Sequence, residues 1–163
     1  EIIRIFLQAG ANAEILNPEA LTPLELAFAK EQPAAARALL KGGCKRDDRL
    51  LSDCMSKIME ASDRASWMPV LDLLAMDAED LNISGGILGT PPLHYAAYLG
   101  LDTVVLSLLK RGADPARTDL DGWTALHWAV MKGDLKAKHP EKLKIVELLL
   151  QFTHFIKPVN VKT

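Results

Sequence analysis

The sequence predicts an all-α solenoid in which pairs of short helices are joined by loops that look like β-hairpins. One observation is a helix-entry motif that occurs as Pro91-Pro-Leu-His94 and, 33 residues later, as Thr124-Ala-Leu-His127. Another is a pair of adjacent leucines that follows the motif at a fixed distance. A glycine three residues after most of these pairs is the third. Repeats of this length are helix-pair units that bury their apolar faces by stacking on one another.

The leucine of the entry motif sets the register along the chain. The anchors are Leu24, Ile58, Leu93 and Leu126, at intervals of 34, 35 and 33 residues. Pro suits the first position of a helix and a Thr hydroxyl can cap its start. Thr22-Pro-Leu-Glu25 has Glu in place of the motif His and therefore predicts a capping box.

The leucine pairs predict a second helix in each repeat. Three of them lie 15 and 16 residues after their anchors, whereas the last lies 23 and 24 residues after Leu126. The last repeat therefore contains an eight-residue insertion. The pairs are Leu39-Leu40, Leu73-Leu74, Leu108-Leu109 and Leu149-Leu150. Gly10, Gly43 and Gly112 suit the positive φ that ends a helix.

The segment from Asp48 to Ser84 follows the pattern least well, because Ser56-Lys-Ile-Met59 stands at the motif position. Apolar residues at helical spacing around Ile58 and Val70 still predict two helices there. Ser66 and Pro69 fit the start of the second of them.

These residues resemble the ankyrin repeat family over nearly the whole chain. Gly10-Ala-Asn12 and Gly112-Ala-Asp114 are similar to the exit of an ankyrin repeat, and the Thr-x-Leu-His entry is similar to its start. The tetratricopeptide repeat has a similar period but lacks both features. The resemblance implies a rigid, non-catalytic module that binds another protein, with His94 and His127 fixing turns.

We expect one ankyrin repeat domain over residues 1–163. The chain begins inside a second helix, as a piece of a longer protein would. The expected parts are a truncated half-repeat (1–16), a repeat (17–49), a divergent repeat (50–85), a repeat (86–118), a repeat with an insertion near 136–143 (119–154), and a tail or further repeat (155–163).

Composition narrows the class of protein. A hydrophobic content of 49% allows a continuous core, and neither a membrane-length apolar run nor a signal-peptide pattern occurs. Cys44 and Cys54 are too few for a disulfide framework, so an intracellular protein is expected. Residues 1–81 carry 9 basic and 14 acidic side chains, and residues 82–163 carry 10 and 7. This asymmetry fits an interaction surface and ordinary solvated helices equally well.

No catalytic, cofactor or metal site is expected, because no nucleotide-binding motif, nucleophile elbow or zinc spacing occurs. Asp119-Leu-Asp-Gly122 lacks the later ligands of a calcium loop, and Val130 stands where that loop has Glu. It is interpreted as a hairpin turn.

Partner-binding positions follow from the family register, in which hairpin tips and first helices line a concave face. Trp123 is the expected anchor, since exposed aromatic side chains often dominate binding energy. Trp128 and Tyr95 are expected to pack between repeats instead. The predicted partner-binding residues are Ile87, Leu88, Thr90, Tyr98, Leu99, Leu120, Asp121, Trp123, Met131 and Lys132.

Two alternatives stay open at the sequence level. The segment could be the targeting or regulatory domain of a larger enzyme or channel. The lysine-rich insertion could instead bind an anionic ligand such as nucleic acid or lipid, although it has no aromatic side chain or arginine to contact bases, and a solvated loop before a helix at Pro140 is the simpler interpretation. Its basic patch consists of Lys136, Lys138, Lys142 and Lys144.

Overall fold

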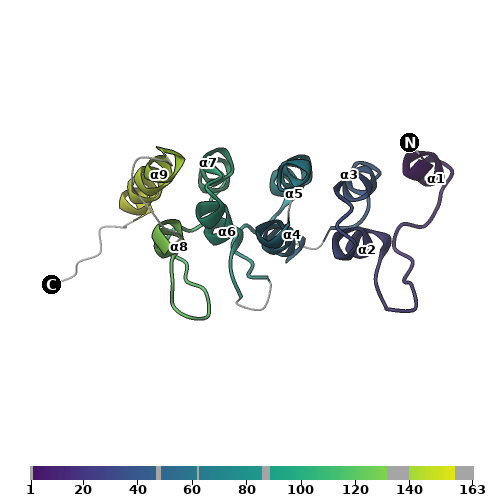
Figure 1. Cartoon of the computed structure of the whole chain (residues 1–163), viewed down its shortest axis with the longest axis horizontal. Helices are drawn as coiled ribbons and strands as arrows, with labels where there is room; N and C mark the ends of the chain where they lie inside the picture. Colours follow the sequence, from purple (N-terminus) through teal and green to yellow (C-terminus); the bar gives the residue numbers. More distant parts are fainter. Residues whose placement is uncertain (1, 47–48, 62, 86–88, 132–139, 157–163) are drawn as a thin grey trace. The chain divides into compact units, whose positions relative to one another are not determined.

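The computed structural model describes residues 2–46, 49–61, 63–85, 89–131 and 140–156. Short helices follow one another in pairs along the chain (Figure 1). The chain divides into two compact units, Glu1–Ala78 and Glu79–Thr163. None of the helices in these ranges is long and apolar enough to cross a bilayer.

The first unit contains five α-helices and a 3-10 turn within its described residues. They are α1 (Ile2–Gln8), α2 (Pro23–Ala29), α3 (Pro33–Lys41), α4 (Arg49–Glu60), η1 (Ala65–Trp67) and α5 (Met68–Asp77). At the start of α2 the Thr22 hydroxyl accepts a hydrogen bond from the Glu25 N–H, and the Glu25 carboxylate accepts one from the Thr22 N–H at 2.7 Å. The capping box predicted from the sequence is confirmed.

The core of this unit is built from one face of each helix. Leu24, Ala27 and Phe28 of α2 are buried, as are Leu39 and Leu40 of α3. The Phe28 and Trp67 rings stack at 5.3 Å between centroids, which joins α2 to the 3-10 turn. The apolar spacing in α2 and α3 thus places one side of each helix in the core.

The divergent repeat does form two helices, but the predicted register of the first one is wrong. Leu24, Leu93 and Leu126 are each the second residue of their helix, whereas Ile58 is the tenth residue of α4. The buried residues Leu51, Cys54 and Met55 take the places of Leu24, Ala27 and Phe28. Leu51 is therefore the anchor.

The cause is a shorter connection in front of α4. Seven residues, 42–48, separate α3 from α4, whereas fourteen residues, 9–22 and 111–124, precede α2 and α8. The helix is also longer, with 12 residues against 7 in α2 and α8. The lost residues and the added helical turns nearly cancel in length, which kept the sequence period regular.

The second unit consists of α6 (Pro92–Leu99), α7 (Asp102–Lys110), α8 (Ala125–Met131) and α9 (Pro140–Ile156). Isolated bridges pair Gly85 with Thr90 and Thr118 with Thr124, so the predicted hairpin-like loops precede α6 and α8. Within the described ranges, β-structure is limited to these two bridges. The fold class predicted from the sequence is confirmed.

Glycines allow the chain to leave several helices. Gly10, Gly43 and Gly112 have φ values of 84°, 84° and 98°, as predicted for helix exits. Ala20 and Glu31 adopt positive φ without being glycine, at 59° and 50°.

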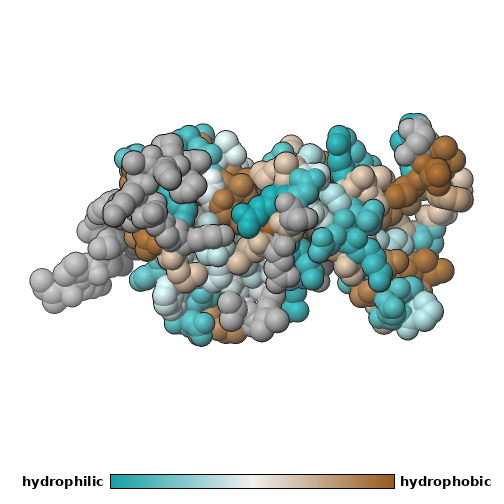
Figure 2. All heavy atoms as spheres, in the orientation of Figure 1, coloured by the Kyte–Doolittle hydropathy of each residue, from teal (hydrophilic) through white to brown (hydrophobic). Residues whose placement is uncertain are grey.

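The surface of α1 is unusually apolar. Ile2, Ile5 and Phe6 are 69%, 55% and 62% exposed. Figure 2 shows hydrophobic surface over this helix. These side chains contribute nothing to the core of the first unit.

Candidate protein-interaction site

The hairpin in front of α8 is organised by one buried carboxylate. One oxygen of Asp119 accepts hydrogen bonds from the backbone N–H groups of Asp121 and Trp123, at 3.1 and 2.8 Å. Its other oxygen accepts one from Trp128 Nε1 at 2.8 Å. Gly122 has φ 81°, and the Asp119 N–H donates to the Trp123 carbonyl at 3.0 Å. The predicted hairpin turn is confirmed, and its backbone is fixed from inside.

His94 ties this hairpin to α6 in the preceding helix pair. Its ring is fully buried, and Nε2 lies 2.9 Å from the Trp123 carbonyl oxygen, so the ring donates its proton there. Burial lowers the pKa of His94 below its ordinary value, which favours the neutral ring. This confirms the structural role expected for His94.

His127 occupies the same position in the next repeat but has different partners. Its Nδ1 accepts a hydrogen bond from the Thr124 N–H at 3.1 Å and lies 2.8 Å from the Thr124 hydroxyl. It therefore fixes its own turn, as expected, while its ring remains exposed.

Trp123 is held in place by its backbone and is open to solvent at its ring. The side chain is 43% exposed, and its ring meets His127 edge-on at 5.8 Å between centroids. Leu120 at the hairpin tip is 78% exposed and lies over Gly89, where an added Cβ would be 2.8 Å from Leu120 Cγ. Asp121 and Met131 are exposed too. Four predicted residues thus lie on the accessible surface of one hairpin and helix.

Two further predicted residues are only half accessible. Tyr98 and Leu99 end α6 with partly exposed side chains. The Tyr98 ring packs edge-on against Trp128 at 5.8 Å, and Tyr95 meets the same indole at 5.6 Å. Tyr95 and Trp128 are buried, which confirms the predicted packing between repeats.

Thr90 was expected at an exposed position, and that expectation is wrong. It is fully buried because its backbone pairs with Gly85 at the base of the hairpin, at 3.0 and 3.3 Å. Thr90 stands where the next repeat has Trp123, so the register placed it well but its side chain faces inward. Ile87, Leu88 and Lys132 lie outside the described residues.

The lysine-rich segment differs from the loop that was expected at its C-terminal end. The helix α9 begins at Pro140, as predicted, and so includes Lys142 and Lys144. Lys142 is 7% exposed, and Lys144 forms a salt bridge with Asp102 of α7. The prediction of an exposed patch is therefore wrong for Lys142. Lys136 and Lys138 lie outside the described residues.

No catalytic or metal centre is assembled by the part of the chain that the structure describes. Within it, no three His, Cys, Asp or Glu side chains converge to hold a metal ion. Cys44 and Cys54 are free and buried, and burial raises the pKa of the Cys54 thiol. A buried thiol held in its protonated form is a poor nucleophile.

Sequence reasoning missed two exposed residues beside Trp123. His127 and Val130 line the same side of α8, with Val130 45% exposed. The spacing held a usable signal, since Trp123, His127 and Met131 recur every four residues and so share one helix edge. Assigning His127 only to the turn hid its accessible ring.

Comparison with known proteins agrees with this architecture. Residues 93–150 match the family model for ankyrin repeats in many copies. Over 62 residues, or 38% of the chain, the sequence is 42% identical to palmitoyltransferase AKR1 of Kluyveromyces lactis. Over 62 residues, or 37% of the chain, it is 47% identical to human transient receptor potential cation channel subfamily A member 1. The matched segments span only 8% and 6% of those two proteins.

A solved structure extends the match to almost the whole fold. The crystal structure of an ankyrin repeat domain from Acinetobacter baumannii AYE superposes with a TM-score of 0.67 at 23% identity, and the match covers 93% of this chain and 76% of that one. The capped helix pairs, the glycine exits and the hairpin held by His94 are what these comparisons share with the sequence pattern. The chain belongs to the ankyrin repeat family.

Proposed function

We propose that the chain is a non-catalytic module that binds a partner protein on the surface formed by the Thr118–Thr124 hairpin and α8. Ankyrin repeats are generally protein-interaction modules, and this surface is where the second unit exposes an aromatic side chain. The observation that carries the proposal is Trp123, which is accessible although its backbone is fixed on both sides. An anchor that is already ordered loses little conformational entropy when a partner binds.

The surrounding residues supply a matching surface. Leu120, Val130 and Met131 are apolar and exposed, and Asp121 adds a charge beside them. An apolar centre with a polar edge is the usual composition of a protein interface. Tyr98 and Leu99 belong to the proposal as neighbouring contacts, with a smaller area available to the partner.

Site-specific cross-linking tests this proposal. A photoreactive amino acid replaces Leu120 in one chain and Lys110, an exposed residue at the end of α7, in a matched control. We expect a discrete protein adduct from position 120, not from position 110, and its loss when Trp123→Ala is added. Replacing a binding hot spot by Ala costs about 2 kcal/mol or more. An adduct that survives Trp123→Ala in a folded chain would remove Trp123 from the site.

A second proposal concerns the protein around this segment. The relatives named above are a palmitoyltransferase and a cation channel, and the matched segments are small parts of them. We infer that the segment could serve as the targeting or regulatory region of such a larger protein. Sequencing the full-length transcript tests this, because a reading frame without any catalytic or pore-forming region would end the proposal.

A further inference from the structure

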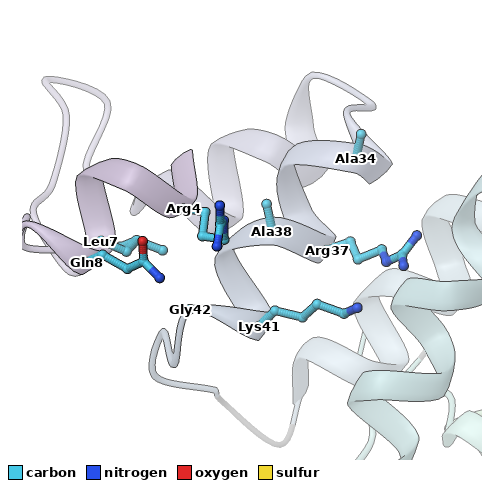
Figure 3. Close-up of a pocket in the computed structure, with 8 residues that line it drawn as sticks. All are labelled: Arg4, Leu7, Gln8, Ala34, Arg37, Ala38, Lys41 and Gly42. Atoms are coloured by element: carbon cyan, nitrogen blue, oxygen red, sulfur yellow. The ribbon is translucent and has the colours of Figure 1, made fainter. Parts of the chain in front are cut away.

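A groove of about 670 Å³ lies between α1 and α3, and all its lining residues belong to the first unit (Figure 3). Its floor is made of small side chains, since Ala34, Ala38 and Gly42 follow one another at four-residue intervals. Leu7 of α1 packs over Gly42, where an added Cβ would lie 2.1 Å from Leu7 Cδ1. The two helices therefore approach closely at one end and leave the floor open beyond it.

The edges of the groove are positively charged. Figure 3 shows Arg37 and Lys41 projecting side by side from one edge of α3, with Arg4 of α1 at the opposite edge. The helices α1 and α3 contain no Asp or Glu, and residues 33–46 contain four basic side chains and no acidic one. No carboxylate lines the groove.

This positive surface contrasts with the unit that carries it. Residues 1–78 contain 9 Lys and Arg against 12 Asp and Glu. Three cations gathered around one groove in an otherwise acidic unit repel one another, and a bound anion would relieve that repulsion. Arginine adds geometry to the charge, because its planar guanidinium can donate two parallel hydrogen bonds to one carboxylate.

The floor adds a second requirement. A small inorganic anion could neutralise Arg4 or Arg37 but would leave the alanine floor and Leu7 uncovered. An occupant with an apolar side chain between two acidic groups would satisfy both the floor and the edges. The volume lies in the range of natural ligand pockets, and grooves between helices are a common site for peptide recognition.

We propose that the groove binds an acidic peptide segment of a partner protein. One apolar side chain would rest on Ala34 and Ala38, and carboxylates on either side of it would reach Arg4 and the Arg37–Lys41 pair. This site is separate from the one proposed on the second unit, so either can fail without the other.

Fluorescence anisotropy with the 163-residue chain tests the assignment. The probe is a labelled synthetic peptide with one leucine between pairs of glutamates, and a matched peptide carries lysines instead. We expect the acidic peptide to bind, with an affinity that falls as salt rises, and the basic peptide not to bind. Equal binding of both peptides, or of neither, would overturn the proposal. So would inorganic phosphate that displaces the peptide as effectively as unlabelled peptide does.

Charge variants locate the binding. Arg37→Glu combined with Lys41→Glu should weaken the acidic peptide about tenfold or more, since attraction becomes repulsion. Lys30→Glu combined with Lys57→Glu makes the same change in net charge at exposed residues outside the groove. That control should change affinity less than about twofold. An equal loss in both pairs would overturn the assignment.

Glutamine versions of Arg37 and Lys41 serve if the charge reversal disturbs folding. Circular dichroism checks that each variant keeps its helices. The neutral pair should still bind the acidic peptide several times more weakly than the original chain, and unchanged affinity in a folded neutral pair would exclude these two side chains.

Discussion

At the scale of single residues, two turns of the first unit use a strained conformation that the second unit avoids. The turns at Asn17–Leu21 and Asp119–Trp123 have the same hydrogen bonds, and Ala20 occupies the place of Gly122. Glu31 likewise stands where α6 is followed by Gly100, which has φ 78°. A side chain at positive φ costs free energy that glycine does not.

Exchanging the two turn residues should therefore change stability in opposite directions. Ala20→Gly should raise the free energy of unfolding by up to about 1 kcal/mol, and Gly122→Ala should lower it by about 1 kcal/mol. No atom lies within 4 Å of a Cβ added at Gly122, so its cost is conformational. Urea denaturation followed by circular dichroism measures both, and a destabilising Ala20→Gly would contradict the interpretation.

His94 should make stability depend on pH. Because burial lowers its pKa, the unfolded chain binds a proton below about pH 6.5 that the folded chain does not bind. The free energy of unfolding should fall as pH falls through that value, and the fall should stop once the pH is below the pKa of the folded state.

The comparison variant for this prediction is His94→Gln, which keeps an N–H donor for the Trp123 carbonyl. Its urea midpoint should fall less between about pH 7.5 and about pH 5.5 than that of the original chain. The other three histidines contribute to both proteins alike. Parallel falls in the two chains would assign the pH dependence to other groups.

At the scale of structural elements, the Thr118–Thr124 hairpin depends on Asp119 more than on its short backbone bridge. Asp119→Ala leaves the Trp128 indole N–H and the Trp123 N–H without their acceptor, which should cost about 2 kcal/mol or more. Hydrogen exchange at Trp123 should accelerate in the same variant.

Asp121→Ala is the matched control for this change. Asp121 is exposed, and its removal should change stability by less than about 0.5 kcal/mol. If Asp119→Ala has an effect as small as that of Asp121→Ala, then the turn does not need its carboxylate. The same pair separates a loss of partner binding caused by a loosened hairpin from one caused by a lost contact.

The helices themselves were largely predictable from local sequence, and α4 shows where that stopped. Pro23, Pro92 and Pro140 each mark a helix start, because proline suits the first position of a helix. In α4, Leu51, Cys54 and Met55 form a buried face without any entry motif, and a regular period drew attention to Ile58 instead. A compensating deletion and insertion leave the spacing unchanged, so periodicity cannot reveal them.

The candidate site was predictable in position but less so in exposure. The register identified Leu120, Asp121 and Trp123 because hairpin tips of this family face solvent. It could not show that Thr90 turns inward or that Lys142 is buried in α9, since both depend on contacts distant in sequence. Burial of a single side chain is a tertiary property that its own repeat does not determine.

At the scale of the whole molecule, the tryptophans report on the two units separately. Trp67 is buried in the first unit and Trp128 in the second, and Trp123→Phe would remove the exposed one. In repeat proteins, stability is a sum of local and nearest-neighbour terms. A defect in one unit should therefore affect its own reporter most.

Leu108→Ala provides such a defect, since Leu108 is fully buried in α7. A cavity of this kind costs about 2–5 kcal/mol. In chains that keep only one buried tryptophan, the urea midpoint should fall further for Trp128 than for Trp67. Equal shifts would show that both units unfold in a single cooperative step.

The seven-residue connection before α4 offers a place for engineering. Its counterparts before α2 and α8 are twice as long and carry a turn fixed by Asn17 or Asp119. A grafted loop of the same design would extend outward without replacing any buried side chain, and the entropy of closing a loop rises only slowly with its length. This repeat could therefore receive a new recognition loop while Leu51, Cys54 and Met55 continue to hold the core.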